Sequence, residues 1–178
     1  VNNVNDPPML GAISNISVNE DSGTNLITLT VIGPGGVNEN QNVTVTARSD
    51  SPLIIPDPAI TYTTRATVAT LRFVPVPNAT GTAQITVTVD DGGLSNSVAT
   101  RLFMVTVLPV NDPPSVLGPG PVTTPEDTST GPLPVLVADI DSPPTSITLL
   151  ALSSNPSLVP TNNISFVGAG TDRTVELR

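Results

Sequence analysis

Short segments in which apolar and polar residues alternate run through most of the chain, and turn-forming residues separate them. The clearest segment is 84–89, in which Ile85, Val87 and Val89 occupy every second position. A period of two places these side chains on one face of a β-strand, because successive strand residues point to opposite sides of a sheet. Segment 97–108 shows the same alternation, and the residues between the two segments favour a turn. The pattern predicts strands rather than helices.

Strand-like segments recur along the first part of the chain at about ten-residue spacing, which is typical of a β-sandwich. Seven segments fit this description: 13–18, 26–31, 43–47, 59–63, 67–74, 84–89 and 97–108. The large side chains of Tyr62, Phe73 and Phe103 lie on these segments, where such residues are ordinarily buried. We therefore expect all three in the core of the sandwich.

The pentapeptide Val-Asn-Asp-Pro-Pro occurs twice, at 4–8 and at 110–114. The residues that follow each copy can be aligned, and the Glu-Asp pairs that begin at Glu20 and Glu126 lie 106 residues apart. In the middle of the two copies the spacing falls to 104 residues, so the second copy carries a two-residue deletion. The sequence is thus a tandem repeat of similar modules joined by a proline-rich linker.

The repeat predicts the domain organisation. We expect an incoming linker at 1–8, a complete sandwich at 9–109, an interdomain linker at 110–114, and the N-terminal part of a second sandwich at 115–178. By alignment the second module lacks counterparts of segments 84–89 and 97–108. The parent protein is expected to continue beyond Arg178; otherwise a neighbouring chain would donate the missing strands. The expected fold class is all-β, with tandem Greek-key β-sandwiches, the second incomplete in this chain.

Composition narrows the function classes. The net charge is −9, with six basic residues against fifteen acidic ones, which disfavours binding to nucleic acid or to anionic membranes. The chain has no His and no Cys, so disulfides, thiolate metal sites and the usual nucleophile–base pairs are excluded. Aromatic residues make up 2%, which leaves little material for stacking platforms. No apolar run is long enough to insert into a membrane. We do not expect an enzyme.

Several short motifs, in order along the chain, resemble those of one family. The end of segment 97–108 runs into Val-Asn-Asp-Pro-Pro much as a final cadherin strand runs into its linker. Further matches are Asn19-Glu-Asp21, Pro125-Glu-Asp127, Val87-Thr-Val-Asp-Asp-Gly-Gly-Leu94 and Asp139-Ile-Asp141. Together they resemble the tandem cadherin-like or immunoglobulin-like repeats of large bacterial surface proteins and adhesins, over nearly the whole chain.

The resemblance implies calcium held at the junctions between modules, because calcium takes carboxylate, amide and carbonyl oxygens. At the central junction the implied ligands are Glu20, Asn111, Asp112, Asp139 and Asp141. At the N-terminal junction they are Asn5, Asp6, and Asp90 or Asp91. The chain departs from the family pattern, since Gly33-Pro-Gly-Gly stands where the first repeat should carry Asp-x-Asp. A single ion at the central junction, or none, is the expectation.

The alternative for these acidic residues is that they form turns, and that the two prolines make the linker a stiff spacer. The expected function is a structural or adhesive spacer segment of an extracellular, cell-surface repeat protein. Its partners would be neighbouring repeats of the same chain, and other copies in a fibre or surface layer if strands are exchanged. A further alternative is an accessory spacer within a secreted hydrolase.

Overall fold

The computed structural model describes residues 4–37 and 39–178, and contacts divide the chain into two compact units between Val110 and Asn111. The regular elements of the described residues are eleven strands and two short 3-10 turns, so the fold is all-β, as expected. No helix in the described part of the chain has the length and apolar character needed to span a bilayer. Each unit is described by itself below.

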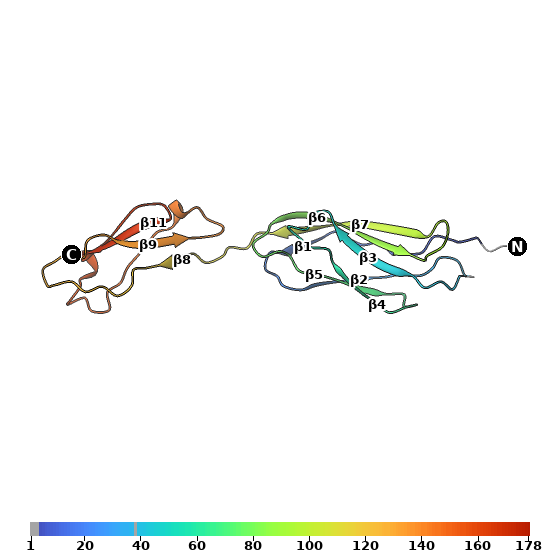
Figure 1. Cartoon of the computed structure of the whole chain (residues 1–178), viewed down its shortest axis with the longest axis horizontal. Coiled ribbons are helices and arrows are strands. Elements are labelled where there is room, and N and C mark those ends of the chain that lie inside the picture. Colours follow the sequence, from blue (N-terminus) through green and yellow to red (C-terminus); the bar gives the residue numbers. More distant parts are fainter. Residues whose placement is uncertain (1–3, 38) are drawn as a thin grey trace. The chain divides into compact units, whose positions relative to one another are not determined.

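Unit 1 is a sandwich of two sheets (Figure 1). The four-stranded sheet has the order β1-β7-β6-β3, with β1 parallel to β7 and the other pairs antiparallel. The three-stranded sheet has the order β2-β5-β4. The strands are β1 (Ile16–Asn19), β2 (Asn25–Leu29), β3 (Thr44–Ser49), β4 (Ala59–Tyr62), β5 (Ala69–Phe73), β6 (Gly81–Asp90) and β7 (Val98–Leu108). Each coincides with one of the seven expected segments, with ends shifted by a few residues.

The core of unit 1 lies between the two sheets and follows the alternation of the sequence. Ile85, Val87 and Val89 of β6 are all fully buried, and Phe103 and Phe73 are nearly so. Tyr62 packs against the core with its ring, while its hydroxyl donates to the carbonyl of Ala66 at 3.0 Å. The period-two pattern thus located the core correctly.

Unit 2 contains one four-stranded sheet in the order β10-β11-β9-β8. Its strands are β8 (Ser115–Leu117), β9 (Leu133–Ala138), β10 (Ile164–Val167) and β11 (Asp172–Leu177), and its 3-10 turns are Pro144–Ser146 and Thr161–Asn163. Strands β9, β11 and β10 are the counterparts of β2, β5 and β4 at the spacing of the sequence repeat. The second unit therefore builds the three-stranded sheet of the first again.

The pairing register of this sheet is repeated at its centre and shifted at its edge. Ile27 pairs with Leu71 in unit 1, and their counterparts Leu133 and Val175 pair in unit 2. At the edge, β10 is displaced along β11 by two residues relative to β4 along β5. An even displacement keeps every side chain on its original face, so the amphipathic pattern survives.

The turn around the Glu-Asp pair is also repeated. Asp21 and Asp127, 106 residues apart, both adopt a left-handed backbone with φ of 55° and 58°. Asp is one of the few non-glycine residues that accept this conformation readily. The pair thus marks the same turn in both units.

A buried arginine distinguishes unit 2. Arg173 stands where unit 1 has Ala69, yet it is only 6% exposed. Its guanidinium donates to the main-chain carbonyls of Gly170 at 3.0 Å, Ile147 at 2.8 Å and Pro144. A planar fork of donors suits several acceptors at once. Arg173 therefore ties the loop around the first 3-10 turn to β11.

Candidate functional site

The N-terminal end of unit 1 brings two of the predicted site residues together. The Asn5 amide nitrogen donates to the Asp91 carboxylate, with distances of 3.1 and 3.3 Å to its two oxygens, and to the Ser95 carbonyl at 3.0 Å. Asp91 is 4% exposed, and its Oδ1 also accepts the Gly93 main-chain N–H at 2.8 Å. A buried carboxylate needs such donors, because desolvation of an unpaired charge is costly. The incoming linker is thus attached to the turn after β6.

Asp6 joins the same end of the unit through its main chain. Its N–H donates to Glu39 Oε1 at 2.7 Å, and Glu39 is 8% exposed. Gln41 adds a further tie, since its amide nitrogen donates to Asn5 Oδ1 at 2.8 Å. Sequence reasoning missed both Glu39 and Gln41.

Asp90, the other predicted member of this set, belongs to a local turn. Its Oδ1 accepts the main-chain N–H of Gly92 at 2.8 Å. Such a bond from Asp to the residue two positions later is the ordinary Asx turn. Of the N-terminal set, the structure therefore connects Asn5 with Asp91, ties Asp6 to Glu39, and leaves Asp90 in its turn.

The linker before unit 2 is held in the same way. The main-chain N–H of Asp112 donates to Asp141 Oδ2. Asp139 orders the loop that presents Asp141, because its Oδ1 accepts the N–H groups of Asp141 at 2.9 Å and Ser142 at 2.8 Å. Asn111 donates from its side chain to the Asp112 carbonyl at 2.9 Å. Four of the five residues predicted for the central junction are thus connected within unit 2.

Glu39 and Asp141 perform the same task in the two units. Each accepts the main-chain N–H of the linker Asp, which is Asp6 before unit 1 and Asp112 before unit 2. Unit 1 therefore supplies a carboxylate although it carries Gly33-Pro-Gly-Gly in place of Asp-x-Asp. The two-residue length difference between the repeats falls in the stretch between Glu20 and Pro52, which contains Glu39.

Glu20, the remaining member of the central set, lies in unit 1 and is 3% exposed. Its Oε1 accepts the main-chain N–H of Val110 at 2.8 Å, and its own N–H donates to the Leu108 carbonyl at 2.9 Å. The carboxylate thus fixes the chain where it leaves the last strand of the unit. Its counterpart in unit 2, Glu126, is exposed.

The carboxylates of each unit mainly accept main-chain or amide N–H groups. Among residues 4–37 and 39–178, no three acidic side chains are grouped so as to hold a metal ion. Calcium prefers six to eight oxygen ligands, and the sets within the single units fall short of that number. The central set of Glu20, Asn111, Asp112, Asp139 and Asp141 draws on both units and stays a prediction.

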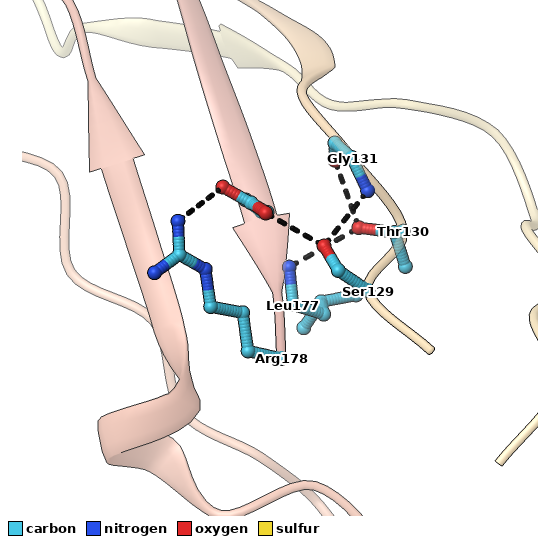
Figure 2. A network of polar contacts seen from close by, with 6 residues as sticks. Ser129, Thr130, Gly131, Leu177 and Arg178 are labelled. Carbon is cyan, nitrogen blue, oxygen red and sulfur yellow. Dashed lines mark hydrogen bonds and ion pairs between the residues drawn. The ribbon is translucent and has the colours of Figure 1, made fainter. Parts of the chain in front are cut away.

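A separate network of hydrogen bonds lies at the C-terminal end of β11 (Figure 2). Glu176 accepts from Arg178 at 3.0 Å and from the Ser129 hydroxyl at 2.6 Å, and these two donors, Arg178 first, hold the pKa of Glu176 below its usual range. The same ion pair raises the pKa of Arg178. Thr130 adds a bond from the Leu177 N–H at 3.1 Å. The network connects the segment before β9 to the end of β11, and its Ser129 and Arg178 are exposed.

No protein-family model matches the chain, and no curated protein sequence matches it. Solved structures resemble it at low identity. The titin domains z1z2 in complex with telethonin are 15% identical with a TM-score of 0.44, and the match covers 98% of this chain and 82% of that two-domain chain. Protocadherin gammaB7 EC3-6 is 14% identical with a TM-score of 0.46, covering 97% of this chain and 39% of its own. The surface layer protein SbsC, domains 4–9, is 16% identical with a TM-score of 0.37, and the match covers 99% of this chain and 27% of the SbsC chain. These values are too low to assign a family or a function.

Proposed function

We propose that the chain is a structural spacer segment of an extracellular repeat protein, in which β-sandwich units follow one another at controlled spacing. The observation that carries the proposal is the anchoring of the linker on both sides of Asn111. The main-chain N–H of Val110 donates a hydrogen bond to the Glu20 carboxylate of unit 1, and the main-chain N–H of Asp112 donates one to the Asp141 carboxylate of unit 2. A single residue separates the two anchored positions.

The residues after this point restrict the linker further. Pro113 and Pro114 follow Asp112, and proline fixes its own φ and restricts the residue before it. Few main-chain torsions remain free between the last bond to unit 1 and the first bond to unit 2. The same combination precedes unit 1, where Asp6 is bonded to Glu39 and is followed by Pro7 and Pro8. A device that recurs before each unit supports a role in setting the spacing of repeats.

The test measures the distribution of distances between the units. Because the chain has no cysteine, Thr64→Cys and Ala169→Cys, both at exposed positions, allow one spin label in each unit. We expect a narrow distribution, and a wider one when Glu20→Ala and Asp141→Ala are combined. Glu126→Ala is the matched control and should leave the width unchanged. An equally wide distribution in the parent chain and the double variant would refute the spacer proposal.

Calcium at the central junction is a second part of the proposal. It is supported by the oxygen chemistry of Glu20, Asn111, Asp112, Asp139 and Asp141, which are the ligand types that calcium prefers. A bound ion would stabilise the native state. We expect about 1 mM calcium, the range of extracellular calcium modules, to raise the melting temperature above that in chelator, and Asp139→Asn with Asp141→Asn to abolish the rise. Superimposable melting curves with calcium and with chelator would contradict calcium binding and leave the spacer proposal intact.

A further inference from the structure

Unit 2 retains counterparts of the two outer strands of the sheet β1-β7-β6-β3. At the repeat spacing, β1 corresponds to 122–125 and β3 corresponds to 148–153. In unit 1 these outer strands pair with β7 and β6 respectively. In the described residues of unit 2, neither counterpart takes part in a strand ladder. In unit 1 the same two segments are the edges of a sheet whose centre is the β6–β7 hairpin.

The segment that corresponds to β3 keeps the pattern of a strand. Ile147, Leu149 and Ala151 are half-buried, and the residues between them are exposed. This alternation matches Val43–Ser49 of unit 1 position by position, where the exposed residues belong to the outer face of the sheet. Leu150 and Leu152 are 89% and 90% exposed. The segment therefore already presents an inner and an outer face but lacks a partner for its main chain.

The turn that follows shows what such a hairpin covers in unit 1. In unit 1 Ile55 is fully buried, and Gly81 at the start of β6 lies so close to Ile54 that a β-carbon there would be 3.0 Å from its Cδ1. The same turn occurs in unit 2, with a bond from the N–H of Val159 to the Asn155 carbonyl at 2.9 Å. Yet Leu158, the counterpart of Ile54, is 77% exposed. Leu158 and Val159 line an open groove together with Val122 and Leu177.

We propose that this groove, together with the edge segment 148–153, is an acceptor site for a two-stranded antiparallel β-hairpin built like β6–β7. One strand of the hairpin pairs antiparallel with 148–153, and the other pairs parallel with 122–125. Unit 1 identifies the occupant, because there the hairpin fills the same place between the same two edges, with Ile85, Val87 and Val105 fully buried. Addition of strands to open edges supplies main-chain hydrogen bonds for affinity and side-chain pockets for specificity.

The register follows from unit 1. Val45 pairs with Val89, so its counterpart Leu149 should face the hairpin residue equivalent to Val89. Ile16 pairs with Val105, so Val122 should face the equivalent of Val105. The proposal concerns unit 2 alone and does not depend on whether the array serves as a spacer. It would give strand exchange between chains a defined acceptor.

The probe is a synthetic peptide of residues 79–110 of this chain, added to the full chain. We expect one peptide to bind per chain and hydrogen exchange of the amides in 148–153 to slow by roughly tenfold or more, since ladder amides exchange only on opening. A second arm appends residues 79–110 after Arg178 through a flexible linker, and the same amides should then be protected without free peptide. Absence of protection in both arms would overturn the proposal.

Matched variants test the face and the register. Ile85→Asp with Val87→Asp in the peptide should abolish binding, whereas Thr82→Asp with Gln84→Asp adds the same charge at outward positions and should not. In the chain, Leu149→Asp should abolish binding and Leu150→Asp should retain it. Equal binding of both peptides would also overturn the proposal.

Discussion

At the scale of single residues, the carboxylates near the linkers act chiefly as acceptors for main-chain N–H groups. Glu39 and Asp141 differ in residue type and in place along the repeat, but both accept from the Asp of the preceding linker. A charged acceptor makes a stronger hydrogen bond than a neutral one. The acidic composition therefore has a structural use that is independent of any cation.

Glu20→Ala should destabilise unit 1 by about 1–2 kcal/mol, because it removes a charged acceptor and leaves the Val110 N–H without it. The free energy of unfolding from urea denaturation provides the measurement. Glu126→Ala, at the counterpart position in unit 2, alters an exposed side chain and should change stability by less than about 0.5 kcal/mol. Equal losses in the two variants would contradict the assigned role of Glu20.

The pH dependence of unit 2 should reflect the lowered pKa of Glu176. Its ordinary value is 4.5, and Arg178 and Ser129 lower it in the folded state. A carboxyl with a depressed folded pKa stabilises the protein above its unfolded pKa, and this contribution is lost as the pH falls through the folded value. An NMR titration should give Glu176 a midpoint below 4.5. Glu176→Gln should remove the associated loss of thermal stability in acid, and a Glu176 midpoint at or above 4.5 would contradict the assignment.

At the scale of elements, two similar sequences build the same three-stranded sheet, but the layer that packs on this sheet differs between the two units. Leu71 of β5 is fully buried under the opposing sheet, whereas its counterpart Val175 in β11 is half-buried. Leu71 pairs with Ile27 of β2, and Val175 pairs with Leu133, the counterpart of Ile27, in β9. The ladder thus repeats faithfully, while the burial of each position depends on what packs above it.

Leu71→Ala should therefore destabilise unit 1 by about 2–5 kcal/mol, the usual cost of emptying a well-packed core position. Val175→Ala removes fewer atoms from a less buried position and should cost unit 2 clearly less. Because the chain has no tryptophan, chemical denaturation followed by far-ultraviolet circular dichroism would compare the free energies of unfolding of the two variants. A larger loss in Val175→Ala would show that unit 2 has a better-packed interior than its exposures indicate.

The sequence was sufficient for elements whose pattern is local. The seven strands of unit 1, the burial of Phe103 and the repeated Glu-Asp turn all follow from alternation or spacing within a few residues. Glu39 could not be recognised in the same way, because its function depends on how far a loop reaches toward the linker. The displacement of β10 along β11 was also unpredictable, since an even shift leaves the amphipathic pattern unchanged.

At the scale of the whole molecule, the two units differ in the size of their interior. The core cluster of unit 1 draws on both sheets, while Val135 and Val137 are the buried hydrophobic residues of unit 2 among those the structure describes. Stability rises with the apolar area removed from water. Unit 1 should accordingly be the more stable unit.

We expect urea denaturation of the chain to show two transitions, with unit 2 unfolding at the lower concentration. Hydrogen exchange at intermediate urea should find the amides of β6 still protected when those of β11 have exchanged. The variant Leu71→Ala should move the second transition and leave the first in place. A single transition reported identically by both sets of amides would contradict independent unfolding.

The parallel pairing of β1 with β7 has a mechanical consequence. β1 is the first strand after the incoming linker and β7 is the last strand before the outgoing one, and their ladder runs from the pair Ile16–Val105 to the pair Asn19–Leu108. Tension applied through the two linkers would pull them in opposite directions along their length. Hydrogen bonds that run across the direction of tension are loaded together, whereas bonds at the end of a hairpin open one after another. A stretched array of such units should therefore resist force until a whole β1–β7 ladder gives way at once.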